Sequence, residues 1–376
     1  MRHDDPRTAA YGWSPSRRDV LRGAAAVGIG LGGAFATGPL LAQSLVGQDF
    51  PVRASEVEAN GLSFHVIEQG EGSAVLFCHG FPDTARTWLN QMRAVAEAGY
   101  RAVALDMRGY GESYAPADAT LYTALHIAGD LVGVLDALRI ERAVLVGHDW
   151  GADHAWRAAL MRPDRFRAVV SLGIPYLPRG EVSHWDALRS QGLEDRSYYF
   201  DMLDPDAKSR FAAAEETIPS ILYWLSASPQ AAARWDPNDP ALHMLRPAPV
   251  DVPGWADPTY VGHTIRTFAR TGFQGGLNHY RALQATFDLM PAYKGAAVRQ
   301  PSLYIYGAAD GLTRLFHPTP PTLDELWRTV PGLLDIVRLE NAGHWMQHEA
   351  ADRVNAVLLD FLGMLEPDVG TAKRDG

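Results

Sequence analysis

The feature that most constrains the fold of this 376-residue chain is a turn between a buried strand and a helix. The apolar run Val144–Val146 leads into Gly-His-Asp-Trp-Gly at residues 147–151, and a helical pattern follows. Glycines at both ends of such a turn let the backbone bend sharply, so that the central residue is strained and exposed at the end of the strand. We therefore expect the side chain of Asp149 to project from this turn.

The residue type at position 149 limits the chemistry that the turn can support. A serine must lose a proton before it attacks, whereas a carboxylate is already anionic at neutral pH. Asp149 therefore suits displacement at a saturated carbon, as in an epoxide or a carbon–halogen bond, through an ester between enzyme and substrate. The alternative is a structural role, in which Asp149 accepts the free N–H groups of the following helix.

Short apolar runs without clean alternation recur along the chain, and helical patterns lie between them. Strands that are buried on both faces of a parallel sheet have this appearance. The first two runs flank Asn60-Gly61, the strongest short signal for a hairpin. The pattern predicts an α/β fold in which an antiparallel hairpin leads into a mostly parallel, doubly wound sheet. The expected strands are residues 52–58, 62–68, 74–78, 101–105, 143–146, 168–172, 302–306 and 334–339.

The alternation of strands and helices stops after Tyr176 and resumes at Gln300. The segment between them is rich in Trp, Tyr, Pro and helical stretches. A structureless loop of that length is implausible in a compact domain, so we expect an inserted helical cap. The predicted division is a core formed by residues 44–176 and 295–376, with the cap at 177–294.

Two further polar residues follow expected strands near the C-terminus. Asp310 lies in Gly-Ala-Ala-Asp-Gly at 307–311, and His344 lies in Asn-Ala-Gly-His-Trp at 341–345. Each alone would be an ordinary turn residue. Together with Asp149, however, they follow the chain order nucleophile, acid, histidine, which is the order found in folds with this kind of turn. Asp310 would hold His344 in the right tautomer, and His344 would activate the water that attacks the ester.

A third motif, His-Gly-Phe-Pro-Asp at 79–83, follows the strand that ends at Cys78. In isolation it would be an ordinary turn. Next to the Asp149 turn, we expect the backbone N–H groups of Phe81 and Trp150 to form an oxyanion hole for the ester oxygen as the second step charges it.

The N-terminus is typical of a targeting segment. Arg17 and Arg18 precede residues 23–48, which carry no charge and are rich in Ala and Gly. This resembles a bacterial twin-arginine signal peptide, so we expect residues 1–43 to be removed and the protein to be periplasmic or secreted. The alternative is an uncleaved membrane anchor, but the glycines and Pro39 make a poor permanent span. We expect no stable membrane insertion after cleavage.

Composition excludes several classes of function. A net charge of −10 without a basic patch argues against nucleic acid as a partner. The single cysteine, Cys78, excludes an intramolecular disulfide framework and leaves no room for a cysteine-rich zinc site. No histidine pair has metal-ligand partners at convincing spacing, so we expect no metal ion. These patterns do not fix the oligomeric state.

Together the motifs resemble those of the epoxide hydrolase group of the α/β-hydrolase family, over almost everything from about residue 52 to 365. Asp-Met-Arg-Gly-Tyr-Gly-Glu-Ser at 106–113 and Ala-Gly-His-Trp at 342–345 occur widely in that fold. Phe81 of the His-Gly-Phe-Pro motif and the Asn-His-Tyr-Arg segment at 278–281 are more specific. The resemblance implies an α/β-hydrolase fold and hydrolysis, without a cofactor, of a hydrophobic epoxide by water to a vicinal diol.

In that group, two tyrosines of the cap hold the epoxide oxygen and protonate it as the ring opens. Tyr280 matches one of them and is also expected, with Phe81 and Trp150, to contact the substrate. For the second tyrosine, spacing to Pro205 selects Tyr198, whereas matching the Tyr-Phe pair at 199–200 places Arg196 there. The first alignment is preferred, and packing within the cap is the alternative role for both tyrosines.

Other activities fit the same turn. A haloalkane dehalogenase would use Trp150 as a halide donor, but those enzymes resemble His-Gly-Asn-Pro in the loop that here contains Phe81, and they need no donor such as Tyr280. A fluoroacetate-type dehalogenase places arginine at position 150. The absence of serine at position 149 disfavours an esterase or lipase. A non-catalytic, ligand-binding member of the fold would be expected to lack part of the triad.

Overall fold

The computed structural model describes residues 51–316 and 321–366 of the chain. The expected signal peptide at residues 1–43 lies outside the described residues. Within the described ranges, no helix combines the length and apolarity needed to span a membrane.

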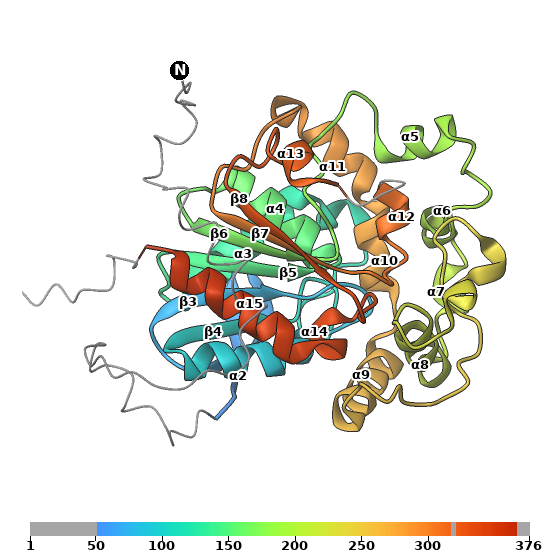
Figure 1. The fold of residues 1–376 in the computed structure, drawn as a ribbon, viewed down its shortest axis with the longest axis horizontal. Helices are drawn as coiled ribbons and strands as arrows, with labels where there is room; N and C mark the ends of the chain where they lie inside the picture. The colour runs from blue at the N-terminus through green and yellow to red at the C-terminus, as the bar shows by residue number, and fades with distance from the viewer. Residues whose placement is uncertain (1–50, 317–320, 367–376) are drawn as a thin grey trace, which may run out of the picture. The chain divides into compact units, whose positions relative to one another are not determined.

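In the part of the chain that the structure describes, eight strands form one sheet in the order β1-β2-β4-β3-β5-β6-β7-β8 (Figure 1). The pairs β1–β2 and β2–β4 are antiparallel, and the other neighbouring pairs are parallel. The predicted fold class, a hairpin followed by a mostly parallel, doubly wound sheet, is therefore confirmed. The strands are β1 (Arg53–Ala59), β2 (Leu62–Gln69), β3 (Ser73–Cys78), β4 (Tyr100–Leu105), β5 (Ala143–His148), β6 (Phe166–Leu172), β7 (Ser302–Gly307) and β8 (Leu333–Leu339).

The central strands are buried on both faces, which explains their uninterrupted apolar sequences. In β5, Val144 and Val146 belong to the apolar layer under α2 (Leu89–Glu97) and α15 (Ala351–Met364). Leu145 belongs to the opposite layer, under α3 (Ala124–Ala137) and α4 (Trp150–Met161). Successive side chains of a strand point to opposite faces, so a strand covered by helices on both sides must be apolar throughout.

The opening hairpin turns at Asn60 and Gly61, whose φ angles are 55° and 75°. Positive φ at both central residues is what a tight two-residue hairpin requires. Val57 and Phe64 pair across the hairpin. The Asn60 side-chain amide also donates to the carbonyl of Gly129 in α3 at 2.8 Å.

Between β6 and β7 the named elements are helices, and most of them lie together beyond the carboxyl ends of the strands (Figure 1). They are α5 (His184–Ser190), α6 (Tyr198–Leu203), α7 (Ala207–Arg210), α8 (Ala214–Trp224), η5 (Ala231–Ala233), η6 (Pro240–Leu242), α9 (Pro258–Thr271), α10 (Gln274–Arg281), α11 (Leu283–Leu289) and η7 (Pro291–Tyr293). The remaining short elements are η3 (Ala85–Trp88), η4 (Ala119–Tyr122), α12 (Thr313–Phe316), α13 (Leu323–Leu326) and α14 (Met346–Glu349). We call the helical segment between β6 and β7 the cap; the boundaries at 177 and 294 stay predictions.

Polar contacts hold the cap against the core. The Tyr260 hydroxyl on α9 donates to the buried carboxylate of Asp83 at 2.9 Å. On α10, His279 Nε2 lies 3.0 Å from the carbonyl oxygen of Arg108. Since Asp83 and Arg108 follow β3 and β4, these contacts fix the cap next to the loops at the carboxyl edge of the sheet.

The elbow between β5 and α4 depends on close backbone packing, which gives a first prediction. A Cβ on Gly151 would overlap the carbonyl oxygen of Cys78 in β3. We expect Gly151→Ala to destabilise the fold by about 3 kcal/mol, because backbone cannot yield as a side chain does. Denaturant unfolding of the purified variant measures this loss.

The matched control for that variant is Gly129→Ala in α3. The nearest atom to its added Cβ would be Asn60 Nδ2 at 3.9 Å, an ordinary contact. Since alanine favours a helix over glycine, we expect this variant to be neutral or up to about 1 kcal/mol more stable. Equal stability of the two variants would contradict the packing argument.

Candidate active site

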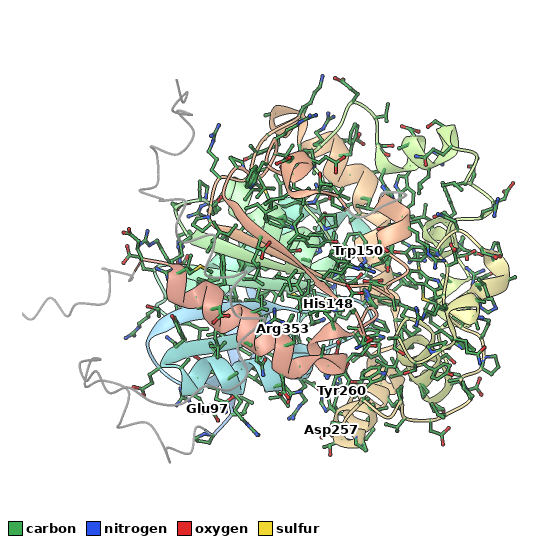
Figure 2. All side chains as sticks on the ribbon, in the orientation of Figure 1. Glu97, His148, Trp150, Asp257, Tyr260 and Arg353 are labelled. Carbon is green, nitrogen blue, oxygen red and sulfur yellow. The ribbon has the colours of Figure 1, made fainter. Side chains whose placement is uncertain are left out.

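Asp149 sits between β5 and α4 in a strained conformation, with φ 53° and ψ −122°. This region of backbone space favours glycine, so the surrounding packing must hold the residue there. Gly80 of the His-Gly-Phe-Pro loop lies against Asp149, and a Cβ on Gly80 would overlap the Asp149 side chain. The neighbouring residues His148 and Trp150 lie where the strands meet the cap (Figure 2).

The Asp149 carboxylate is held from the core side by backbone amides. The Phe81 N–H donates to Asp149 Oδ1 at 2.9 Å, and the Trp150 amide also interacts with the carboxylate. Burial raises the pKa of Asp149 above its ordinary value, while His344 and the two amides oppose this rise. The amides of Phe81 and Trp150 thus converge on one carboxylate, and their role as an oxyanion hole stays a prediction.

His344 and Asp310 meet Asp149 from the ends of β8 and β7. His344 Nδ1 lies 3.1 Å from Asp310 Oδ2, and His344 Nε2 lies 3.8 Å from Asp149 Oδ2. Both carboxylates and the imidazole are buried. Asp310 accepts the Nδ1 proton, which leaves the Nε2 lone pair of neutral His344 on the side of Asp149.

The environment of His344 sets its charge. Burial lowers its pKa, but the carboxylate of Asp310, its hydrogen bond and the charge of Asp149 outweigh burial, so that the pKa lies above 6.5. His148, one residue before the nucleophile position, shows the opposite balance: burial and the neighbouring His344 hold its pKa well below the ordinary value. Neutral His148 can donate from Nε2 to the His344 carbonyl at 2.8 Å and accept from Gln347 at Nδ1 at 3.2 Å.

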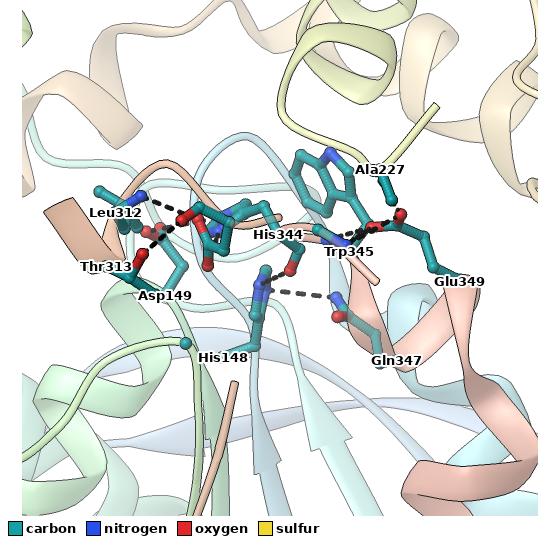
Figure 3. A network of polar contacts seen from close by, with 12 residues as sticks. His148, Asp149, Ala227, Leu312, Thr313, His344, Trp345, Gln347 and Glu349 are labelled. Carbon is teal, nitrogen blue, oxygen red and sulfur yellow. Dashed lines mark hydrogen bonds and ion pairs between the residues drawn. The ribbon is translucent and has the colours of Figure 1, made fainter. Parts of the chain in front are cut away.

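Glu349 on α14 holds the loop that carries His344, and sequence reasoning missed it (Figure 3). Its carboxylate accepts the backbone N–H groups of Gly343 at 3.0 Å and Trp345 at 3.0 Å, on either side of His344. It also accepts the N–H of Ala227, which follows α8 of the cap, at 2.7 Å. No sequence signal separates Glu349 from a surface glutamate, because its partners are backbone groups.

The cap places three tyrosines above Asp149. Tyr280 on α10 has its ring centroid 4.8 Å from that of Trp150, and Tyr198 and Tyr199 on α6 lie 6.1 Å and 5.5 Å from Tyr280. Burial, followed by the charge of Asp149, raises the pKa of Tyr280 well above its ordinary value. Burial and the neighbouring tyrosines do the same for Tyr198.

Of the two residues considered for the second tyrosine position, Arg196 is exposed while Tyr198 is buried beside Tyr280. Tyr199, which is not among the residues predicted from the sequence, has its ring closer to Tyr280, at 5.5 Å against 6.1 Å for Tyr198. A cavity of about 330 Å³ reaches Asp149, and its walls include Trp150 and Tyr199. Tyr198 instead borders a second cavity of about 420 Å³, whose walls also include Trp235.

Among residues 51–316 and 321–366, no group of three or more His, Cys, Asp or Glu side chains is arranged to hold a metal ion. Cys78 is buried in β3, as its apolar surroundings predict.

The charge on Asp310 gives a second prediction. In Asp310→Asn, the main group that raises the pKa of His344 is lost while burial remains, so we expect this pKa to fall below 6.5. An NMR titration of His344 in both proteins measures the shift. At a pH between the two values, His344 is then protonated in the parent protein and neutral in the variant. Asp164→Asn, at an exposed ion pair, should leave the titration unchanged.

The chain matches known proteins over most of its length. Residues 73–351 match the family model of the alpha/beta hydrolase fold. The chain is 53% identical over 311 residues to an epoxide hydrolase of Caballeronia sordidicola, covering 83% of this chain and 94% of that protein. It is 37% identical over 317 residues to epoxide hydrolase A of Mycobacterium tuberculosis, covering 82% and 97%.

Solved structures agree with these relatives. An epoxide hydrolase from an endophytic Streptomyces superposes with a TM-score of 0.76 at 34% identity, covering 83% of this chain and 95% of that one. Epoxide hydrolase A from Mycobacterium thermoresistibile gives 0.76 at 35% identity, covering 85% and 100%. With this likeness and the arrangement around Asp149, the chain belongs to the epoxide hydrolases of the α/β-hydrolase fold family.

Proposed function

We propose that the protein converts an epoxide and water to a vicinal diol through an ester on Asp149. The observation that carries the proposal is the buried arrangement of Asp149, His344 and Asp310, with backbone amides on one side of the nucleophile and cap tyrosines on the other. The haloalkane dehalogenase and the non-catalytic protein considered above are not favoured by the relatives that the chain matches.

In the first step, Asp149 attacks one carbon of the epoxide. The Phe81 amide holds Oδ1, so Oδ2 is the oxygen that forms the new C–O bond as the ring C–O bond breaks. The departing alkoxide is strongly basic and needs a proton. One of Tyr280 and Tyr198 transfers its phenolic proton to this oxygen and is left as a tyrosinate, while the other holds the oxygen by a hydrogen bond. Both phenols are protonated beforehand, since burial raises their pKa values.

In the second step, neutral His344 removes a proton from water, and the hydroxide attacks the Asp149 carbonyl carbon. The negative charge that develops on the ester oxygen is stabilised by the N–H groups of Phe81 and Trp150. Collapse of this intermediate breaks the bond from the carbonyl carbon to Oδ2, and the expelled oxygen takes the proton of the new carboxyl group, which restores the Asp149 carboxylate. The proton held by His344 returns to the tyrosinate, so that the cycle closes. Asp310 stabilises the imidazolium form of His344 in between.

The two-step scheme predicts a trapped intermediate. In His344→Gln the first step should proceed and the second should stop, because no base activates the water. We expect turnover of styrene oxide to fall by about 10³-fold or more, and the protein to gain the mass of one substrate. Intact-protein mass spectrometry after incubation measures the adduct.

Asp149→Asn is the control, since an amide does not attack the epoxide. This variant should neither turn over nor gain mass. An unmodified His344→Gln protein that still produces diol would rule out the ester mechanism.

The contribution of each tyrosine to ring opening can be compared by removing one hydroxyl at a time. We expect Tyr280→Phe and Tyr198→Phe each to slow formation of the ester by about 10²-fold, because each removes a proton donor for the epoxide oxygen. Tyr199→Phe should have a smaller effect. Single-turnover kinetics in the His344→Gln background measures the alkylation rate alone. A larger loss for Tyr199→Phe than for Tyr198→Phe would assign the second donor to Tyr199.

For the location of the protein, we propose export by the twin-arginine pathway and a periplasmic or secreted mature form. The support is the sequence: Arg17 and Arg18 stand just before an uncharged segment rich in Ala and Gly. No stable insertion into the membrane is expected after cleavage.

A further inference from the structure

The cavity that reaches Asp149 has a charged wall that the two-step reaction does not use. Asp153 and Arg157 line it together with Asp149. Asp153 and Arg157 are spaced by four within α4, so helical periodicity places them on one face, and Asp149 immediately precedes the helix. Asp149 is the nucleophile, whereas the proposed mechanism gives no role to the other two.

The Asp153–Arg157 pair leaves N–H donors of Arg157 without a hydrogen-bond partner in the protein. Arg157 Nε donates to Asp153 Oδ2 at 2.7 Å, and each side chain is only 17% exposed. Among the hydrogen bonds of the described residues, none uses the terminal nitrogens of Arg157. A guanidinium carries five N–H donors, and the terminal nitrogens of Arg157 are not among the fully buried polar atoms that lack a partner, so they are open to the cavity. These nitrogens are therefore available to an acceptor in the cavity.

His184 on α5 gives a second, independent indication of a polar ligand. It lines the same cavity, and its Nε2 is buried without a hydrogen-bond partner. Its ring centroid lies 4.5 Å from that of Tyr199, with the two rings tilted by 59°. Burial lowers the pKa of His184 to about 4, and the charges of Asp153 and Arg157 act on it in opposite directions. The cavity thus places an unpaired imidazole nitrogen and a guanidinium with free donors next to each other.

Arg179 at the same cavity provides a contrast. Its Nε donates to the Phe287 carbonyl at 3.2 Å, its Nη1 donates to the Gly180 carbonyl at 2.9 Å, and its guanidinium packs on the Phe287 ring at 3.8 Å. Arg179 therefore uses both Nε and Nη1 within the protein, whereas Arg157 uses Nε alone.

The charges that line the cavity restrict what the acceptor can be. Asp149, Asp153 and Glu181 are acidic and Arg157 and Arg179 are basic, so the lining carries no net positive charge. A carboxylate on the substrate would meet two aspartates close to its binding partner, whereas a neutral oxygen would gain the hydrogen bond without this repulsion.

The geometry points to an epoxide whose substituent in this cavity carries a neutral oxygen acceptor, such as a hydroxyl, ether or carbonyl group, bound by Arg157. This inference rests on the proposed epoxide hydrolysis and names its substrate class. Helix geometry separates Arg157 from Asp149 by about 12 Å along the helix axis, and the arginine side chain points back toward Asp153. The acceptor oxygen of the substrate therefore lies several bonds from its epoxide ring.

The experiment compares two series of terminal epoxides whose chains are about four to eight carbons long. One series ends in a hydroxyl group, and the other, of equal length, ends in a methyl group. The measured quantity is the ratio of the two kcat/KM values, which a general loss of folded enzyme does not change. A hydrogen bond to a charged group predicts a preference of about ten- to a hundredfold for the best hydroxy-epoxide.

The variant is Asp153→Asn combined with Arg157→Met, because removing arginine alone would leave a buried aspartate unpaired. We expect its ratio to fall to about one, while Arg179→Met, the matched control, keeps the ratio of the parent protein. An unchanged ratio in the double variant, or no preference in the parent protein, would overturn the inference. A preference for the ω-carboxylate would do so as well, since it contradicts the charge argument.

A different result would show that the proposed function itself is wrong. If the parent protein forms no diol from either series, epoxide hydrolysis itself is wrong. Diol from both series at equal kcat/KM leaves the proposed function intact and refutes only the role of Arg157.

Discussion

The structure around the active site depends on the strained backbone of Asp149. Its φ of 53° is held by the contact of Gly151 with β3 and of Gly80 with the Asp149 side chain. Each of these contacts needs a residue without a Cβ, and each comes from a different segment of the chain. The central sheet, which brings β3 and β5 side by side, therefore supports the strained conformation of Asp149.

His344 and Asp310 are held in place by hydrogen bonds. His344 takes its tautomer from Asp310, while the path of its loop is fixed by Glu349 through backbone N–H groups. Since Glu349 also bonds Ala227 of the cap, one carboxylate links the position of the histidine loop to that of the cap. The position of His344 therefore depends on the position of the cap.

The cap creates a low-dielectric site in which groups of opposite function coexist. The same burial that raises the pKa of Asp149 keeps Tyr198 and Tyr280 protonated, while two carboxylates keep the pKa of His344 above its ordinary value. Asp149, His344 and these two tyrosines are therefore all buried, each with a pKa shifted by its own surroundings. Their separation depends on which side of Asp149 each occupies: amides and His344 on the core side, phenols on the cap side.

The sequence by itself determined the sheet, the turn at Asp149 and the residues of the expected triad, because apolar runs, glycine spacing and chain order are local signals. The choice between Tyr198 and Arg196 required tertiary structure, since only packing against α10 shows that Arg196 is exposed and Tyr198 buried. Glu349 and Tyr199 were also invisible in the sequence. Their roles depend on contacts between segments far apart in the chain, and no local pattern encodes such contacts.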